Sequence, residues 1–140
     1  MNKILCAWFL CFIFVSGTSV ADVNSEQIQD LNGTEITYLY SSGRSYHVKF
    51  AEEGLSYRYL TGSKPDAWWG PFPYQAMKVK EQLYFTSWFE EGYGDYVTLL
   101  INLQKKELHG SAIISGEEVH FHRANIIKIE KRSELEYRGY

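Results

Sequence analysis

The feature that most limits the fold of this chain is the alternation of apolar and polar residues that begins after Gly33. Side chains on a β-strand point alternately to its two faces, so a repeat of two residues indicates a strand with one buried face. Glycine-containing turns interrupt the alternation at residues 41–43, 52–54 and 61–62. Short strands separated in this way are typical of an antiparallel sandwich or barrel, and they argue against a helical bundle.

The alternating runs predict about eight antiparallel strands that follow one another in sequence order. Eight lie near residues 36–40, 46–50, 55–59, 74–79, 82–90, 96–103, 106–114 and 117–123, with a last run at 124–129. Such a series favours an up-and-down barrel with room inside for one small ligand. Residues 63–73 are the least regular stretch, and we interpret residues 68–73 as a lid over the barrel mouth. An irregular crossing segment is the alternative.

The first 21 residues have the composition of a secretory signal peptide. Lys3 gives a positive start, residues 4–15 are apolar, and Ser19-Val20-Ala21 is a small-residue cleavage site. The apolar run is shorter than the roughly 20 residues needed to cross a bilayer. We therefore expect cleavage, no stable membrane insertion, and a periplasmic or secreted protein.

The expected domain occupies residues 22–130, and residues 131–140 form a charged C-terminal tail. Residues 22–31 are predicted to form a short helix ahead of the barrel. Both cysteines, Cys6 and Cys11, lie in the predicted signal peptide, so the barrel has no disulfide and no thiolate metal site. The chain has 14 Lys and Arg against 17 Asp and Glu, a net charge of −3 without a basic cluster, which argues against a nucleic-acid partner.

A set of residues in the predicted barrel has a characteristic order and spacing. The set comprises Gly33, Tyr38-x-Tyr40, Gly43, Tyr46, Tyr57-Arg58, Gly62, Ser87-Trp88-x-Glu90 and Leu108-His109-Gly110. In these residues the chain resembles the phenolic acid decarboxylases and the related MoaF-like domains. The resemblance implies a calycin-type, lipocalin-like barrel. It covers roughly residues 33–110.

The resemblance also implies a chemistry, because phenolic acid decarboxylases remove CO2 from para-hydroxycinnamic acids without a cofactor. The family's catalytic glutamate matches Glu90, and its two tyrosines match Tyr38 and Tyr40 as clamps for the carboxylate or the phenol. A carboxyl group inside an apolar barrel would have a raised pKa, which suits proton donation near neutral pH. The matching ligand-binding positions are Tyr46, Tyr57 and Trp88.

Two hypotheses follow, and we favour the first at this point. The first is an exported barrel that binds a small aromatic or apolar molecule, and the second is a carboxy-lyase that uses Glu90 as proton donor. The family carries an arginine just before the tryptophan that Trp68 matches, whereas this chain has Ala67 there and Lys64 as the nearest cation. A carboxyl group of Glu90 within reach of the cavity that Tyr38 and Tyr40 enter would favour the enzyme.

The histidines suggest another arrangement. If Ser115-Gly116 were a two-residue hairpin turn, His109 would lie opposite His122, with His120 on the same face. Three imidazoles on one patch could bind zinc or copper. The alternative is an exposed or hydrogen-bonded histidine face, and we assign no metal. An exposed edge in an incompletely closed barrel would also allow a homodimer.

Overall fold

The computed structural model describes residues 31–132, which form one antiparallel sheet of nine strands. The strands are β1 (Thr34–Tyr40), β2 (Ser45–Ala51), β3 (Gly54–Tyr59), β4 (Trp68–Phe72), β5 (Tyr74–Lys80), β6 (Leu83–Glu90), β7 (Asp95–Asn102), β8 (Glu107–Ile114) and β9 (Glu118–Lys131). The prediction of an all-β antiparallel barrel is confirmed. The predicted signal peptide at 1–21, nearly all of the predicted helix over 22–31, and most of the tail lie outside the described residues.

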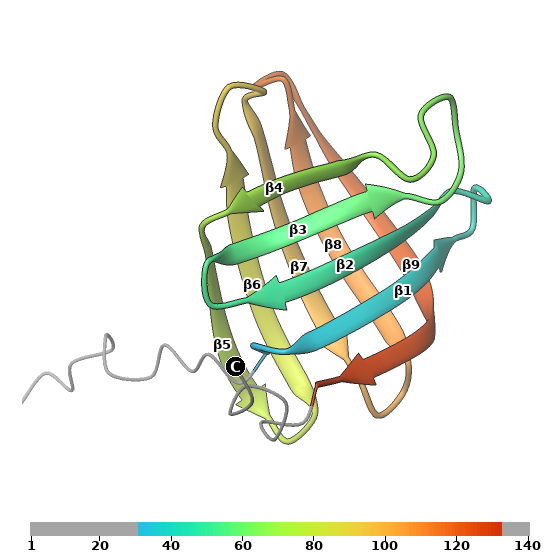
Figure 1. Ribbon diagram of the computed structural model, residues 1–140, viewed down its shortest axis with the longest axis vertical. Helices are drawn as coiled ribbons and strands as arrows, with labels where there is room; N and C mark the ends of the chain where they lie inside the picture. Colours follow the sequence, from blue (N-terminus) through green and yellow to red (C-terminus); the bar gives the residue numbers. More distant parts are fainter. Residues whose placement is uncertain (1–30, 133–140) are drawn as a thin grey trace, which may run out of the picture.

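The strands follow the order β4-β3-β2-β1-β9-β8-β7-β6-β5, so the first and last strands are hydrogen-bonded to each other. Figure 1 shows the sheet wrapping round so that β1–β4 cross in front of the strands from the second half of the chain. The two edges of the sheet are β4 and β5, which are consecutive in the chain and are joined through Pro73. The barrel is therefore nearly closed, and its one seam lies between these two strands.

The inward faces of the strands carry the alternating apolar residues. Ile36 faces Val48 across β1 and β2, and Leu99 and Leu108 lie on β7 and β8. These four side chains are completely buried and belong to one continuous core. Burial of such side chains is the main source of stability for a domain without disulfides.

Two expectations for individual segments are wrong. Residues 68–72 are neither a lid nor an irregular crossing, because they form strand β4, which pairs with β3 and places Trp69 beside Tyr57. The two runs expected at 117–123 and 124–129 are one strand, β9, of 14 residues. Its first half pairs with β8 and its second half with β1, so β9 closes the barrel.

The β8–β9 hairpin also differs from the prediction. Ile114 pairs with Glu118, so the loop contains three residues rather than two. In this register His109 lies opposite Arg123, while His122 lies opposite Gly110. A change of register by one residue exchanges the faces of a strand, so the three imidazoles do not converge. Within residues 31–132, no helical segment has the length and apolar character needed to cross a membrane.

Candidate active site

Tyrosines from three neighbouring strands form a cluster inside the barrel. Tyr38 on β1 and Tyr46 on β2 are cross-strand partners, and their rings are stacked with centroids 5.5 Å apart. Tyr40, two residues further along β1, packs edge-on against both. Tyr57 and Tyr59 on β3 extend the cluster, since the Tyr59 ring lies 5.0 Å from that of Tyr46. The repeat of two residues, applied to three adjacent strands, brings these hydroxyls to one side of the sheet.

The cluster lines a cavity of about 700 Å³ that is open to solvent at one end. A volume of this size suits a small aromatic molecule. The residues that line it are Tyr38, Tyr40, Ser41, Ser42, Arg44, Tyr46, Tyr57, Tyr59, Trp88, Val97, Ala112, Ile114, His120, Phe121, His122 and Arg123. We call this space the tyrosine pocket.

The tyrosine hydroxyls in the pocket keep their protons near neutral pH. Burial raises the pKa of Tyr38 well above its ordinary value, and it raises the pKa of Tyr40 to about 12. Burial, followed by the hydrogen bond to Glu90, raises the pKa of Tyr57. The hydroxyls of Tyr38 and Tyr40 can therefore donate hydrogen bonds to the carboxylate or phenolic oxygen of a ligand, because a neutral phenol is a donor. The Tyr57 hydroxyl donates its proton to Glu90 instead.

Glu90 is a buried carboxyl group held behind the wall of the tyrosine pocket. It ends strand β6 and is only 3% exposed. The Tyr57 hydroxyl donates a hydrogen bond of 2.8 Å to Oε2, and the Trp88 indole Nε1–H donates one of 3.0 Å to Oε1. Burial raises the pKa of Glu90, the two hydrogen bonds oppose this rise, and the charge of Asp95 adds to it. A carboxyl group with a raised pKa is suited to general acid chemistry.

All six residues that the sequence singled out point into the barrel. Tyr38, Tyr40, Tyr46, Tyr57 and Trp88 line the pocket. Glu90 does not line it but lies behind its hydrogen-bond partners Tyr57 and Trp88.

Several residues that line the pocket lie outside the set of ligand-binding residues predicted from the sequence. Arg44 and Tyr59 could have been found by extending the repeat of two from Tyr46 and Tyr57. His120, His122 and Arg123 could not, because their positions depend on the β8–β9 register.

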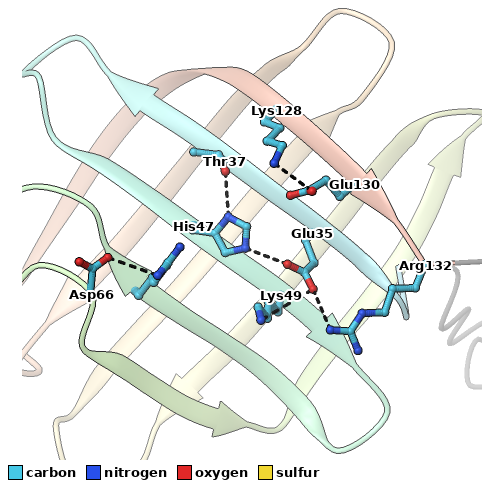
Figure 2. A network of polar contacts seen from close by, with 9 residues as sticks. Glu35, Thr37, His47, Lys49, Asp66, Lys128, Glu130 and Arg132 are labelled. Atoms are coloured by element: carbon cyan, nitrogen blue, oxygen red, sulfur yellow. Dashed lines mark hydrogen bonds and ion pairs between the residues drawn. The ribbon is translucent and has the colours of Figure 1, made fainter.

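A second polar cluster lies on the outer face of β1, β2 and β9 (Figure 2). Both ring nitrogens of His47 are hydrogen-bonded: Nδ1 lies 2.8 Å from Thr37 Oγ1, and Nε2 lies 2.9 Å from Glu35 Oε2. Glu35, His47 and Glu130 have oxygen and nitrogen atoms close enough to bind one metal ion. However, Lys49 and Arg132 also pair with Glu35, and Lys128 pairs with Glu130. These cations already neutralise both carboxylates, so we interpret the cluster as a structural network that joins three strands.

Replacing Tyr57 with phenylalanine is expected to raise the pKa of Glu90. The hydrogen bond from the Tyr57 hydroxyl stabilises the charged carboxylate, so its loss favours the protonated form. The pKa can be measured by following the Glu90 carboxyl carbon in an NMR pH titration. Tyr74→Phe is the matched control, because its hydroxyl donates to Asn32 instead. An unchanged or lowered pKa of Glu90 in Tyr57→Phe would contradict the assignment.

The comparisons with known proteins agree with this geometry. The family model described as phenolic acid decarboxylase (PAD) matches residues 28–134. The chain belongs to the phenolic acid decarboxylase family. The match covers every strand of the barrel, including β9, which lies beyond the region where the sequence resemblance was traced.

A solved structure supports the architecture of this family member. The crystal structure of a provisionally named beta-lactamase from Burkholderia vietnamiensis superposes with a TM-score of 0.60. The alignment covers 73% of this chain and 95% of that chain at 15% sequence identity, so it bears on the fold alone. Among curated proteins, no match was found.

Proposed function

We propose that the barrel binds a phenolic acid of the para-hydroxycinnamic type in the tyrosine pocket and releases its carboxyl group as CO2, without a cofactor. The observation that carries this proposal is the placement of Glu90, a buried carboxyl group with a raised pKa that is hydrogen-bonded to two pocket residues. This chain also belongs to a family whose name describes that reaction.

The proposed reaction needs one proton delivered to carbon and one taken from the phenol. As the phenol passes its proton to solvent through the hydrogen-bonded hydroxyls of Tyr38 and Tyr40, the protonated Glu90 donates its own proton to the alkene carbon that bears the carboxylate. This forms a quinone methide and leaves Glu90 ionised. The bond to the carboxylate then breaks, and its electron pair forms the vinyl double bond and restores the phenolate. CO2 leaves, the phenolate regains a proton from solvent, and solvent reprotonates Glu90.

The neutral tyrosines and the buried carboxyl group have separate roles in this scheme. Tyr38 and Tyr40 donate hydrogen bonds that orient one end of the acid. The rings of Tyr46, Tyr57 and Trp88 provide the aromatic surface against which the ligand packs. Proton transfer requires contact between Glu90 and the substrate, so Tyr57 and Trp88 must shift slightly when the substrate binds.

The second candidate is a binding protein that holds the same ligand without converting it. Two observations favour it. Glu90 lies behind Tyr57 and Trp88 rather than on the pocket surface. Ala67 also occupies the position at which the family resemblance implies an arginine.

One assay separates the two candidates. The purified protein is incubated with para-coumaric acid and ferulic acid, and the loss of the cinnamate absorbance is followed together with the formation of the vinylphenol. Conversion supports the decarboxylase. Saturable quenching of tyrosine and tryptophan fluorescence without conversion supports the binding protein. If neither signal appears, both candidates are wrong.

A further inference from the structure

The mouth of the tyrosine pocket carries basic side chains and, within residues 31–132, no acidic one lines it. Arg44 lies in the turn before β2, and His120, His122 and Arg123 lie on β9. Arg44 and His120 are exposed, whereas Tyr38 in the same pocket is buried. The positive charge of the pocket is therefore carried by the exposed Arg44 and Arg123, since burial lowers the pKa of His122.

The basic groups at the mouth differ in how far they are already neutralised. Arg123 pairs with Glu107 at 3.1 Å. For Arg44, the part of the chain that the structure describes offers no carboxylate partner, and its interaction is with the Tyr46 hydroxyl. An arginine without a counterion among residues 31–132, beside an aromatic pocket, is suited to a carboxylate, which its planar guanidinium can bind through two parallel hydrogen bonds.

A second observation also indicates a ligand at this end of the pocket. Nε2 of His122 is buried and has no hydrogen-bond partner among the described residues. The His122 ring packs edge-on against Tyr40, with centroids 5.0 Å apart, so it is held in place within the pocket wall. Buried polar atoms in folded proteins are nearly always hydrogen-bonded. Nε2 lies against Gly110, so a turn of the ring toward the pocket would let a bound ligand supply the missing partner.

We propose that Arg44, assisted by His122, binds the carboxylate of the ligand, so that the acid enters with its ring inward and its carboxylate toward the mouth. This inference rests on the proposed function and extends it, because it assigns the buried Tyr38 to the phenol end. Arg44 would also provide the guanidinium that the family resemblance implies at residue 67, where this chain has Ala67.

The test compares ligands that differ only in the carboxylate. The affinities of para-coumarate and its uncharged methyl ester are measured by fluorescence quenching. Wild-type protein is expected to prefer the anion. Arg44→Ala is expected to weaken para-coumarate binding about ten- to a hundredfold, the size of a charged hydrogen-bond contact, and to leave the ester nearly unchanged.

Further variants separate a specific contact from a general effect of charge or folding. Arg44→Gln can still bond to Tyr46 but lacks the charge, so it should lose affinity as Arg44→Ala does, while Arg44→Lys should recover only part of it. Arg123→Ala removes a charge at the rim of the pocket, and Lys64→Ala removes one outside it. Both should weaken para-coumarate binding less than Arg44→Ala does. Circular dichroism shows whether each variant is folded.

The outcomes distinguish this inference from the proposed function. If wild-type protein binds or converts para-coumarate and the Arg44 variants match it, the inference is overturned while the proposed function stands. Equal losses in Arg44→Ala and Lys64→Ala would also overturn it. If wild-type protein binds neither ligand, both fail together.

Discussion

Glu90→Gln is expected to abolish decarboxylation of para-coumarate while the protein stays folded. A glutamine has the size of glutamate but no proton that it can donate to carbon. General acid catalysis contributes typically 10²- to 10⁴-fold to a rate, so kcat should fall by about that range. The rate is measured from vinylphenol formation at saturating substrate. Glu91→Gln is the matched control, because Glu91 is the next residue and is exposed.

The same substitution is expected to change how stability depends on pH. The pKa of Glu90 is raised in the folded protein, mainly by burial. Its contribution to stability is therefore present below the unfolded pKa and is lost as the pH rises through the folded pKa. Glutamine does not titrate, so the stability of Glu90→Gln relative to wild type should increase with pH over that window. Urea unfolding at several pH values measures this difference.

Two results would contradict the role of Glu90. Turnover by Glu90→Gln at a rate near that of wild type would show that another group donates the proton. A loss of folding in Glu90→Gln would leave its activity uninformative, and in that case the pH dependence of wild-type kcat decides. A proton donor with a raised pKa requires kcat to fall as the pH rises through that pKa.

Gly110→Ala is expected to lower the free energy of unfolding by about 2–3 kcal/mol. Gly110 lies on the inward face of β8, where a Cβ atom would come within 2.5 Å of Leu99 Cδ2 and 2.7 Å of the Thr98 carbonyl oxygen. The backbone oxygen cannot move without disturbing the β7–β8 pairing, and Leu99 is completely buried. The added methyl group therefore forces the two strands apart.

Urea denaturation measures the effect of Gly110→Ala. Ser111→Ala is the matched control, because it changes the neighbouring residue on the same strand without adding bulk to the inward face. A decrease in unfolding free energy below about 0.5 kcal/mol, the range of ordinary surface substitutions, would show that the strands can adjust to the extra methyl group. Because the same Cβ atom would lie 2.9 Å from His122 Nε2, ligand affinity should also change.

Much of the fold follows from the repeat of two residues along each strand, but this pattern does not predict every strand. The repeat of two residues correctly placed Ile36, Tyr38 and Tyr40 on one inward face, and likewise Tyr46, Val48 and Phe50. It failed at residues 68–72, where Gly70 and Pro71 obscure the alternation of β4. Proline has no backbone N–H to donate, so it is tolerated mainly in an edge strand such as β4, where one side of the backbone has no neighbouring strand.

The β8–β9 hairpin shows why register is harder to predict. With three loop residues at 115–117 in place of two, His109 lies on the opposite face of the hairpin from His120 and His122. Both loop lengths are compatible with the residues present. The choice is made by the packing of the whole strand, because β9 must also pair with β1. His120 and His122 therefore reach the pocket, whereas His109 does not.

By itself, the sequence determined most of the strands, the inward tyrosines and the family, because these depend on residue type and on a spacing that each strand carries within itself. Only the tertiary structure decided that Arg44 from the turn before β2 and His122 from β9 meet at one pocket mouth, and that Glu90 lies behind Tyr57 and Trp88. These positions are set by contacts between segments far apart in the chain. Such contacts depend on closure of the barrel through β1 and β9, which no local pattern encodes.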